Sequence, residues 1–191
     1  METKLISQSL DRAEADAIAV VVGEQEGPPA ELEQCTAWFE ELRTSGEFTG
    51  KPGELAVLHR PPGLAARRLV LAGAGKKQEF NGAALRRAVA STVRALKQKG
   101  VKTLAWALRD GQAEAAVEGA LLGNFEPDQY KTSTKESKSL EAFHVIAGGD
   151  ERQLEAGMER GRILAEAQNF ARDLANEPAN RMTPEIGRAH V

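Results

Sequence analysis

Five short apolar runs punctuate the chain, and each is nearly continuous rather than alternating with polar residues. Continuous runs of this length are typical of β-strands that are covered on both faces, as in the parallel sheets of α/β proteins. A further segment, Thr3–Ser7, predicts a strand at an edge of the sheet. The five runs are Ala17–Val22, Leu55–Leu58, Leu69–Ala72, Thr103–Leu108 and Phe143–Ala147.

Between these runs, hydrophobic residues recur at the three- and four-residue spacing of amphipathic helices. Asn81 is placed to cap the second of these helices, which contains Leu85 and Leu96, and Gly100 suits the left-handed turn that ends it. The fourth helix spans about residues 150–175, where Gly157 and Gly161 permit close packing. The predicted apolar stripes are Leu32, Cys35, Phe39 and Leu42; Leu85, Val89, Thr92 and Leu96; Val117 and Leu121 in a helix starting at Asp110; and Ile163, Ala167, Phe170 and Leu174.

Strands that alternate with helices predict a three-layer α/β fold, in which a mostly parallel sheet is flanked by helices. We place this amino-terminal domain at residues 1–150 and expect residues 151–191 to hold a long connecting helix, a hinge and the truncated start of a second domain. Thr183 and Pro184 are typical of a helix start, yet the chain stops at Val191. We therefore expect the chain to be the front part of a larger protein.

Composition narrows the functional classes. A chain of 191 residues with 41% hydrophobic content is long enough and apolar enough to form a core. The formal net charge is -3 and the basic residues are scattered, so bulk charge does not favour binding to nucleic acid. The single cysteine, Cys35, indicates a reducing compartment. With no signal-like start and no apolar run of membrane-spanning length, we expect a soluble cytoplasmic protein that does not associate with membranes.

The candidate ligand site in the sequence is the turn Gly73-Ala-Gly75-Lys76-Lys77, which directly follows a predicted strand. Glycine-rich turns at the carboxyl ends of strands are where open α/β sheets bind ligands. The third glycine of a dinucleotide-binding fingerprint is missing, so we favour a plain tight turn and keep Gly73, Gly75 and Lys76 as a possible ligand turn. The sequence also lacks the motifs of serine hydrolases, of zinc peptidases with paired histidines, and of dithiol redox proteins.

Four sequence segments become informative when they are taken together. These segments, with their order and spacing over essentially the whole chain, resemble those of the leucyl (cytosol) aminopeptidase family. The specific segment is Asn176–Asn180 with its Arg172-Asp173 lead-in, although Glu177 stands where the family typically has threonine. The four segments are Phe48–Glu54, Leu69–Lys76, Gly123–Lys131 and Ala171–Pro184.

The resemblance implies a two-domain enzyme whose first domain has a macro-domain-like α/β arrangement. Its second domain holds two divalent metal ions, manganese or zinc, and removes N-terminal residues, preferably leucine, from peptides. The family's metal-binding motif and its lysine-bearing strand are absent from this sequence. The resemblance therefore assigns no catalytic residue and no metal ligand to this chain, which we expect to be inactive by itself and to contain no cofactor. For the full-length protein it implies a homo-hexamer with the amino-terminal domains outside.

The segment before the implied catalytic domain predicts a rigid hinge at Asn176, Pro178, Ala179 and Asn180. Pro178 fixes one backbone angle and restricts the residue before it, and asparagine side chains bond readily to nearby backbone groups. An ordinary loop between helices explains the same residues equally well.

Three functions remain open at this point. The leading hypothesis is a non-catalytic domain of a dinuclear-metal leucyl aminopeptidase, with a role in oligomer organisation or regulation and with its own catalytic domain as its partner. The first alternative is a nucleotide- or ADP-ribose-binding module of the macro-domain type that uses residues 73–77. The second is a DNA-binding module, which the acidic balance of charge disfavours.

Overall fold

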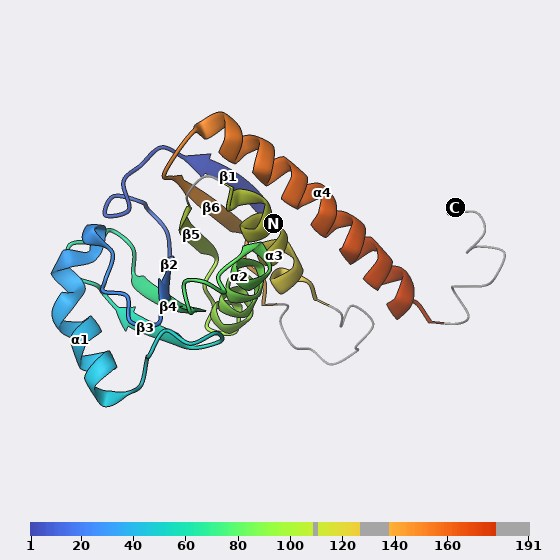
Figure 1. The fold of residues 1–191 in the computed structure, drawn as a ribbon. Coiled ribbons are helices and arrows are strands. Elements are labelled where there is room, and N and C mark those ends of the chain that lie inside the picture. The colour runs from blue at the N-terminus through green and yellow to red at the C-terminus, as the bar shows by residue number, and fades with distance from the viewer. Residues whose placement is uncertain (109–110, 127–137, 179–191) are drawn as a thin grey trace.

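The computed structural model describes residues 1–108, 111–126 and 138–178 of the chain. In this part, six strands form one sheet with helices on both of its faces (Figure 1). In chain order the elements are β1 (Glu2–Ile6), β2 (Ala17–Gly23), the 3-10 helix η1 (Ala30–Cys35), α1 (Thr36–Ser45), β3 (Leu55–His59), β4 (Arg68–Gly75), α2 (Gly82–Lys97), β5 (Thr103–Leu108), α3 (Ala113–Asn124), β6 (Ala142–Ala147) and α4 (Glu151–Asn176).

The strand order in the sheet is β1-β6-β5-β2-β4-β3. Every neighbouring pair is parallel except β3 and β4, which run antiparallel. The prediction of a mostly parallel sheet is therefore confirmed, and the edge strand predicted at Thr3–Ser7 is β1, at the edge beside β6. Because the other five strands share one direction, their carboxyl ends meet at one edge of the sheet.

Two hydrophobic cores fill the space on either side of the sheet. On one side, Phe39 of α1 and Leu32 of η1 pack with strand residues such as Ile18. On the other side, α2, α3 and the start of α4 pack around the fully buried Trp106. The predicted three-layer arrangement is thus confirmed, and both cores include residues of the continuous apolar runs that predict the strands.

The helix boundaries agree with the sequence where capping residues are present. The Asn81 side chain accepts a hydrogen bond from the Ala84 N–H (3.1 Å), and Gly100 has the expected positive φ of 71° after α2. The first predicted helix is instead divided into η1 and α1, and Leu32 within η1 departs from helical geometry. The described part of the third helix begins at Ala113, and its predicted start at Asp110 lies outside the described residues.

The longest helix, α4, packs along α3 and projects past the sheet at its carboxyl end (Figure 1). Its buried face includes Gly157 and Gly161, as predicted, together with larger residues near its start. The stripe predicted from Ile163 to Leu174 is wrong as a core face, because Ile163 is 54% exposed and Phe170 is 53% exposed. The small residues decide the orientation, since only they let the α4 backbone approach α3 closely.

Two further observations bear on the organisation of the chain. Leu154 and Met158 of α4 belong to the core of the α/β domain, while the division at residue 150 stays a prediction. Within the described ranges, no helix is both long enough and apolar enough to cross a membrane.

Candidate functional site

A cleft of about 450 Å³ lies at the edge where the parallel strands end. It is bounded by the carboxyl ends of β2, β4, β5 and β6 and by the loops that follow them. The chain leaves β2 toward α1 on one face, whereas β4 and β5 on either side of β2 lead to helices on the other face. Ligands of open α/β sheets bind in the crevice at such a switch in connection.

Backbone irregularities shape the centre of this cleft. The pairing of β2 with β4 shifts register between Val22 and Gly23, and Gly75 has a positive φ of 79°. The Glu24 N–H then donates to the Gly75 carbonyl oxygen (2.9 Å), which joins the two strand ends. The Glu26 carboxylate accepts a hydrogen bond from the Gly23 N–H (3.0 Å) and lies over that glycine. Bulges of this kind are common beside binding sites because they redirect the chain.

The residues of the predicted ligand turn do not share one site in the structure. Gly73 and Gly75 lie inside β4 rather than after it, which corrects the predicted end of the strand at Ala72. Gly75 lines the cleft, but Gly73 is buried against the Lys51 carbonyl group, with which a Cβ atom would overlap. Lys76 points away into an ion pair with Glu79 (3.7 Å), and its side chain is 61% exposed.

Lys77, the last residue of the candidate turn at residues 73–77, lines the cleft. Other residues that line it were not identified from the sequence. Glu26 and Glu31 line it from the segment that follows β2, and Gln112 lines it from the start of α3. The signal that points to them is their place after parallel strands other than the one that leads into Gly73 and Gly75.

The segments Phe48–Glu54 and Leu69–Lys76, which carry part of the family resemblance, pack against each other. The Gly73 N–H donates to the Glu54 carbonyl oxygen (2.9 Å), and the Gly75 N–H donates to the Gly50 carbonyl oxygen (2.8 Å). The Glu54 carboxylate accepts hydrogen bonds from the Thr49 N–H (2.7 Å) and the Lys51 N–H (3.1 Å). Burial opposes the charge on Glu54, but these donors outweigh it and lower the pKa of the carboxyl group below its ordinary value.

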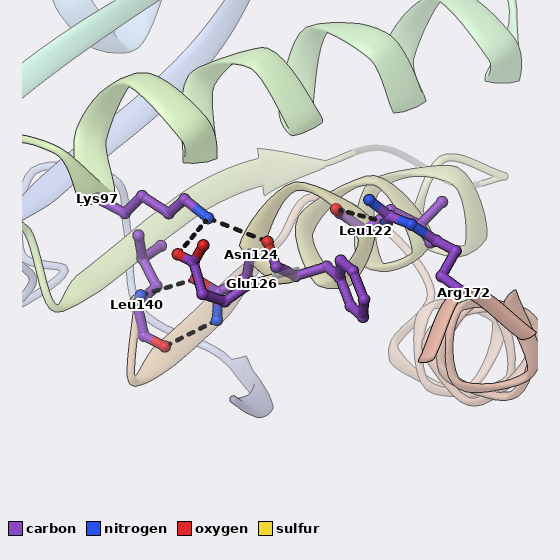
Figure 2. Close-up of polar contacts among 7 residues, drawn as sticks. Lys97, Leu122, Asn124, Glu126, Leu140 and Arg172 are labelled. Atoms are coloured by element: carbon purple, nitrogen blue, oxygen red, sulfur yellow. Dashed lines mark hydrogen bonds and ion pairs between the residues drawn. The ribbon is translucent and has the colours of Figure 1, made fainter. Parts of the chain in front are cut away.

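The other two motif segments meet where α3 ends beside α4 (Figure 2). The Asn124 side chain donates to the Leu140 carbonyl oxygen (3.0 Å) and accepts from the Leu140 N–H (2.8 Å). The Arg172 guanidinium of α4 lies 3.9 Å from the centroid of the Phe125 ring and donates to the Leu122 carbonyl oxygen (3.4 Å). Asn124 thus joins the end of α3 to the segment just before β6, and Arg172 joins α4 to the end of α3.

Two buried charges stabilise the helical layer near this junction. Lys97, which is 6% exposed, donates to the Phe125 carbonyl oxygen (3.2 Å) and forms an ion pair with Glu126 (3.8 Å) (Figure 2). Glu118, which is 2% exposed, accepts from Arg86 (2.7 Å) and from Gln168 (2.8 Å). Buried charges with such partners cost much more to disrupt than exposed ones.

The predicted hinge is described only in part. Asn176 is the last residue of α4, the Glu177 N–H bonds to the Leu174 carbonyl oxygen (3.3 Å), and Pro178 is exposed. Ala179 and Asn180 lie outside the described residues. The hinge therefore stays a prediction.

Candidate metal ligands do not gather anywhere in the described part of the chain. No three or more His, Cys, Asp and Glu side chains in these ranges are placed to hold a metal ion, so a dinuclear metal centre does not fit them. Cys35 is buried, and its burial raises the pKa of the thiol. His144 lies in β6, where burial lowers the pKa of its imidazole.

A family profile and individual relatives match this chain. The profile described as "Cytosol aminopeptidase family, N-terminal domain" matches residues 17–134. A probable cytosol aminopeptidase from Solibacter usitatus is 47% identical over 190 residues, which cover 96% of this chain and 38% of the relative. One from Acidobacterium capsulatum is 34% identical, over 97% of this chain and 41% of the relative. The chain thus spans about two fifths of the length of these curated relatives.

Solved structures share the fold. The bottromycin maturation enzyme BotP, solved in complex with Mn, superposes with a TM-score of 0.68 and 27% identity, over 90% of this chain and 34% of that one. A mutant of tomato leucine aminopeptidase gives a TM-score of 0.77 over 97% of this chain and 40% of that one. Its 22% identity makes the second likeness one of fold alone.

Proposed function

The chain belongs to the cytosol aminopeptidase family, and we propose that it is the non-catalytic amino-terminal domain of a metal-dependent aminopeptidase that removes N-terminal residues from peptides. The observation that carries this proposal is the match of the family's N-terminal domain profile to residues 17–134 of a chain that spans about two fifths of its relatives. In this proposal the catalytic centre, with two manganese or zinc ions, belongs to the part of the relatives' length that this chain does not span. The domain serves to organise or regulate a cytoplasmic hexamer.

The exposed apolar face of α4 supports the proposal that this chain contacts a partner domain. Ile163, Leu164 and Phe170 are the large hydrophobic residues that stand exposed among the described residues, and all three lie on this one helix. Ile163 and Phe170 are seven positions apart and therefore share a side of the helix. Exposed apolar patches on proteins commonly mark interfaces. We assign this face to contact with the catalytic domain of the same polypeptide.

The end of α4 then acts as the link to that domain. The Arg172 contacts with Phe125 and Leu122 hold the helix against α3 within its last turns. A fixed helix followed by Pro178 would direct the next segment along one path, which is the role proposed for the hinge at Asn176, Pro178, Ala179 and Asn180. The boundary between the domains follows residue 150 in this proposal.

The proposal is tested with Phe170→Ser in the full-length protein and in residues 1–191. In the shorter chain the side chain is 53% exposed, so we expect Phe170→Ser to lower the free energy of unfolding by only about 1 kcal/mol. In the full-length protein, loss of a buried aromatic group is expected to cost about 3–5 kcal/mol and to weaken the hexamer. Glu166→Ser on the same helix is the control. Equal small effects of both variants in the full-length protein would contradict the assigned interface.

A second candidate function is small-molecule binding, which the cleft at the strand ends favours. Its position matches the general ligand site of open α/β sheets, so a nucleotide such as ADP-ribose is a candidate ligand. Calorimetric titration of residues 1–191 with ADP-ribose tests this alternative, because saturable heat would support it and a flat titration would remove it.

A further inference from the structure

The cleft at the strand ends combines an apolar floor with a charged rim. Its volume of about 450 Å³ is within the range of small-molecule sites, which is roughly 300–1,000 Å³. Such sites are mostly apolar, with a few polar groups that fix the orientation of the ligand. The floor consists of aliphatic and aromatic residues from separate elements, namely Leu10, Val20, Val21, Phe80, Leu108 and Ile146.

The charged residues on the rim do not favour a polyanion. Those in the described part of the lining are Glu26, Glu31 and Lys77, with no arginine among them. Arginine and lysine side chains bind phosphate groups strongly, whereas the carboxylates of Glu26 and Glu31 would repel them. The rim instead offers one group for a cation and one group for an anion.

The three charged side chains differ in whether they already have a hydrogen-bond partner. Glu26 already accepts the Gly23 N–H with one of its carboxylate oxygens. Glu31 and Lys77 are both exposed, and neither has a side-chain partner within the described ranges. Glu31 comes from the segment after β2 and Lys77 from the segment after β4, so they reach the cleft from different segments of the chain. A ligand that bridges them needs both an ammonium and a carboxylate group.

We propose that this cleft binds an apolar zwitterion of amino-acid or dipeptide size. Glu31 receives its ammonium group, Lys77 receives its carboxylate group, and its aliphatic side chains lie on the apolar floor. Under the proposed function, such molecules are the substrates and products of the aminopeptidase. The biological role of the cleft, as a sensor of peptide breakdown, rests on that function, whereas the binding itself does not.

The test is a calorimetric titration of residues 1–191 with the dipeptide L-leucyl-L-leucine. We expect saturable binding at one site, and Lys77→Met should weaken it about tenfold because a charge-assisted bond is lost. The matched control is Lys76→Met, since the Lys76 side chain pairs with Glu79 outside the cleft. Glu31→Gln should likewise weaken binding, while Glu33→Gln, from the same 3-10 helix but outside the lining, should not.

Other outcomes would overturn the proposal. These are a flat titration, an equal effect of Lys76→Met and Lys77→Met, or undiminished binding of N-acetyl-leucyl-leucine amide, which lacks both charges. Saturable binding of ADP-ribose in place of the dipeptide would assign the cleft to nucleotides instead. The titration needs no peptidase activity, so its failure leaves the proposed function standing, and loss of the proposed function leaves the titration interpretable.

Discussion

The close approach of α4 to α3 at Gly161 allows a sharp test of the packing. A Cβ atom built on Gly161 would overlap the Glu114 carbonyl oxygen and lie 3.1 Å from its carbonyl carbon. Both atoms belong to the backbone of α3, so they cannot move aside as the end of a flexible side chain does. Gly161→Ala should therefore push the helices apart rather than be absorbed locally.

The magnitude follows from two opposing effects. Overpacking costs about 1–3 kcal/mol, and replacing glycine with alanine inside a helix gains about 1 kcal/mol. Because the obstacle is a backbone carbonyl group, we expect the upper part of the cost and a net loss of about 1–2 kcal/mol. For a chain of this length that loss lowers Tm by about 3–6 °C.

The assay is urea unfolding of residues 1–191, followed by circular dichroism. Gly157→Ala is the matched control, because its nearest neighbour is the Ala113 Cβ atom at 3.1 Å and no carbonyl oxygen is among its three nearest atoms. We expect this control to be close to neutral, since the gain in helix propensity offsets a small clash. A neutral or stabilising Gly161→Ala would refute the close contact between the two helices.

Three further predictions concern other parts of the fold. Burial opposes the Asp16 charge, but hydrogen bonds from the Lys102 and Thr103 backbone N–H groups lower the pKa of its carboxyl group below the ordinary value of 3.8. Asp16→Ala should therefore lower the free energy of unfolding by about 1–2 kcal/mol at pH 7. The loss should become smaller as the pH falls below about 4, and unfolding measured as a function of pH checks this. Asn124→Ala removes both bonds to the Leu140 backbone and should cost about 2 kcal/mol, with faster hydrogen exchange at the Leu140 amide as its direct readout. Because Cys35 is 3% exposed and the pKa of its thiol is raised, a disulfide reagent at neutral pH should label it far more slowly in the native than in the unfolded chain.

The strands were predictable because burial on both faces leaves a simple signal. Thr103–Leu108 is a strand with the predicted bounds, and the run Phe143–Ala147 differs by one residue. The order of strands in the sheet was not predictable, since it depends on which long-range pairs form. Asn81 and Gly100 fixed the ends of α2 because capping and positive φ are local properties.

The failures have physical causes as well. Gly73 and Gly75 suggest a turn when taken alone, but glycine also occurs in a strand where another segment approaches closely, and here the loop at Gly50–Lys51 does so. The stripe at Ile163 and Phe170 has helical spacing without burial, because spacing cannot distinguish a helix face that packs on α3 from one that stays exposed. The cleft joins segments that follow five separate strands, so no single motif could have revealed it.

The most direct measurement is hydrolysis of leucine p-nitroanilide by purified residues 1–191 with added manganese or zinc, together with the metal content of the protein. For a non-catalytic domain we expect no turnover above the buffer rate and no stoichiometric metal, while a full-length relative assayed alongside is active. Metal-dependent turnover by residues 1–191 would contradict this assignment and would place a catalytic centre within the chain.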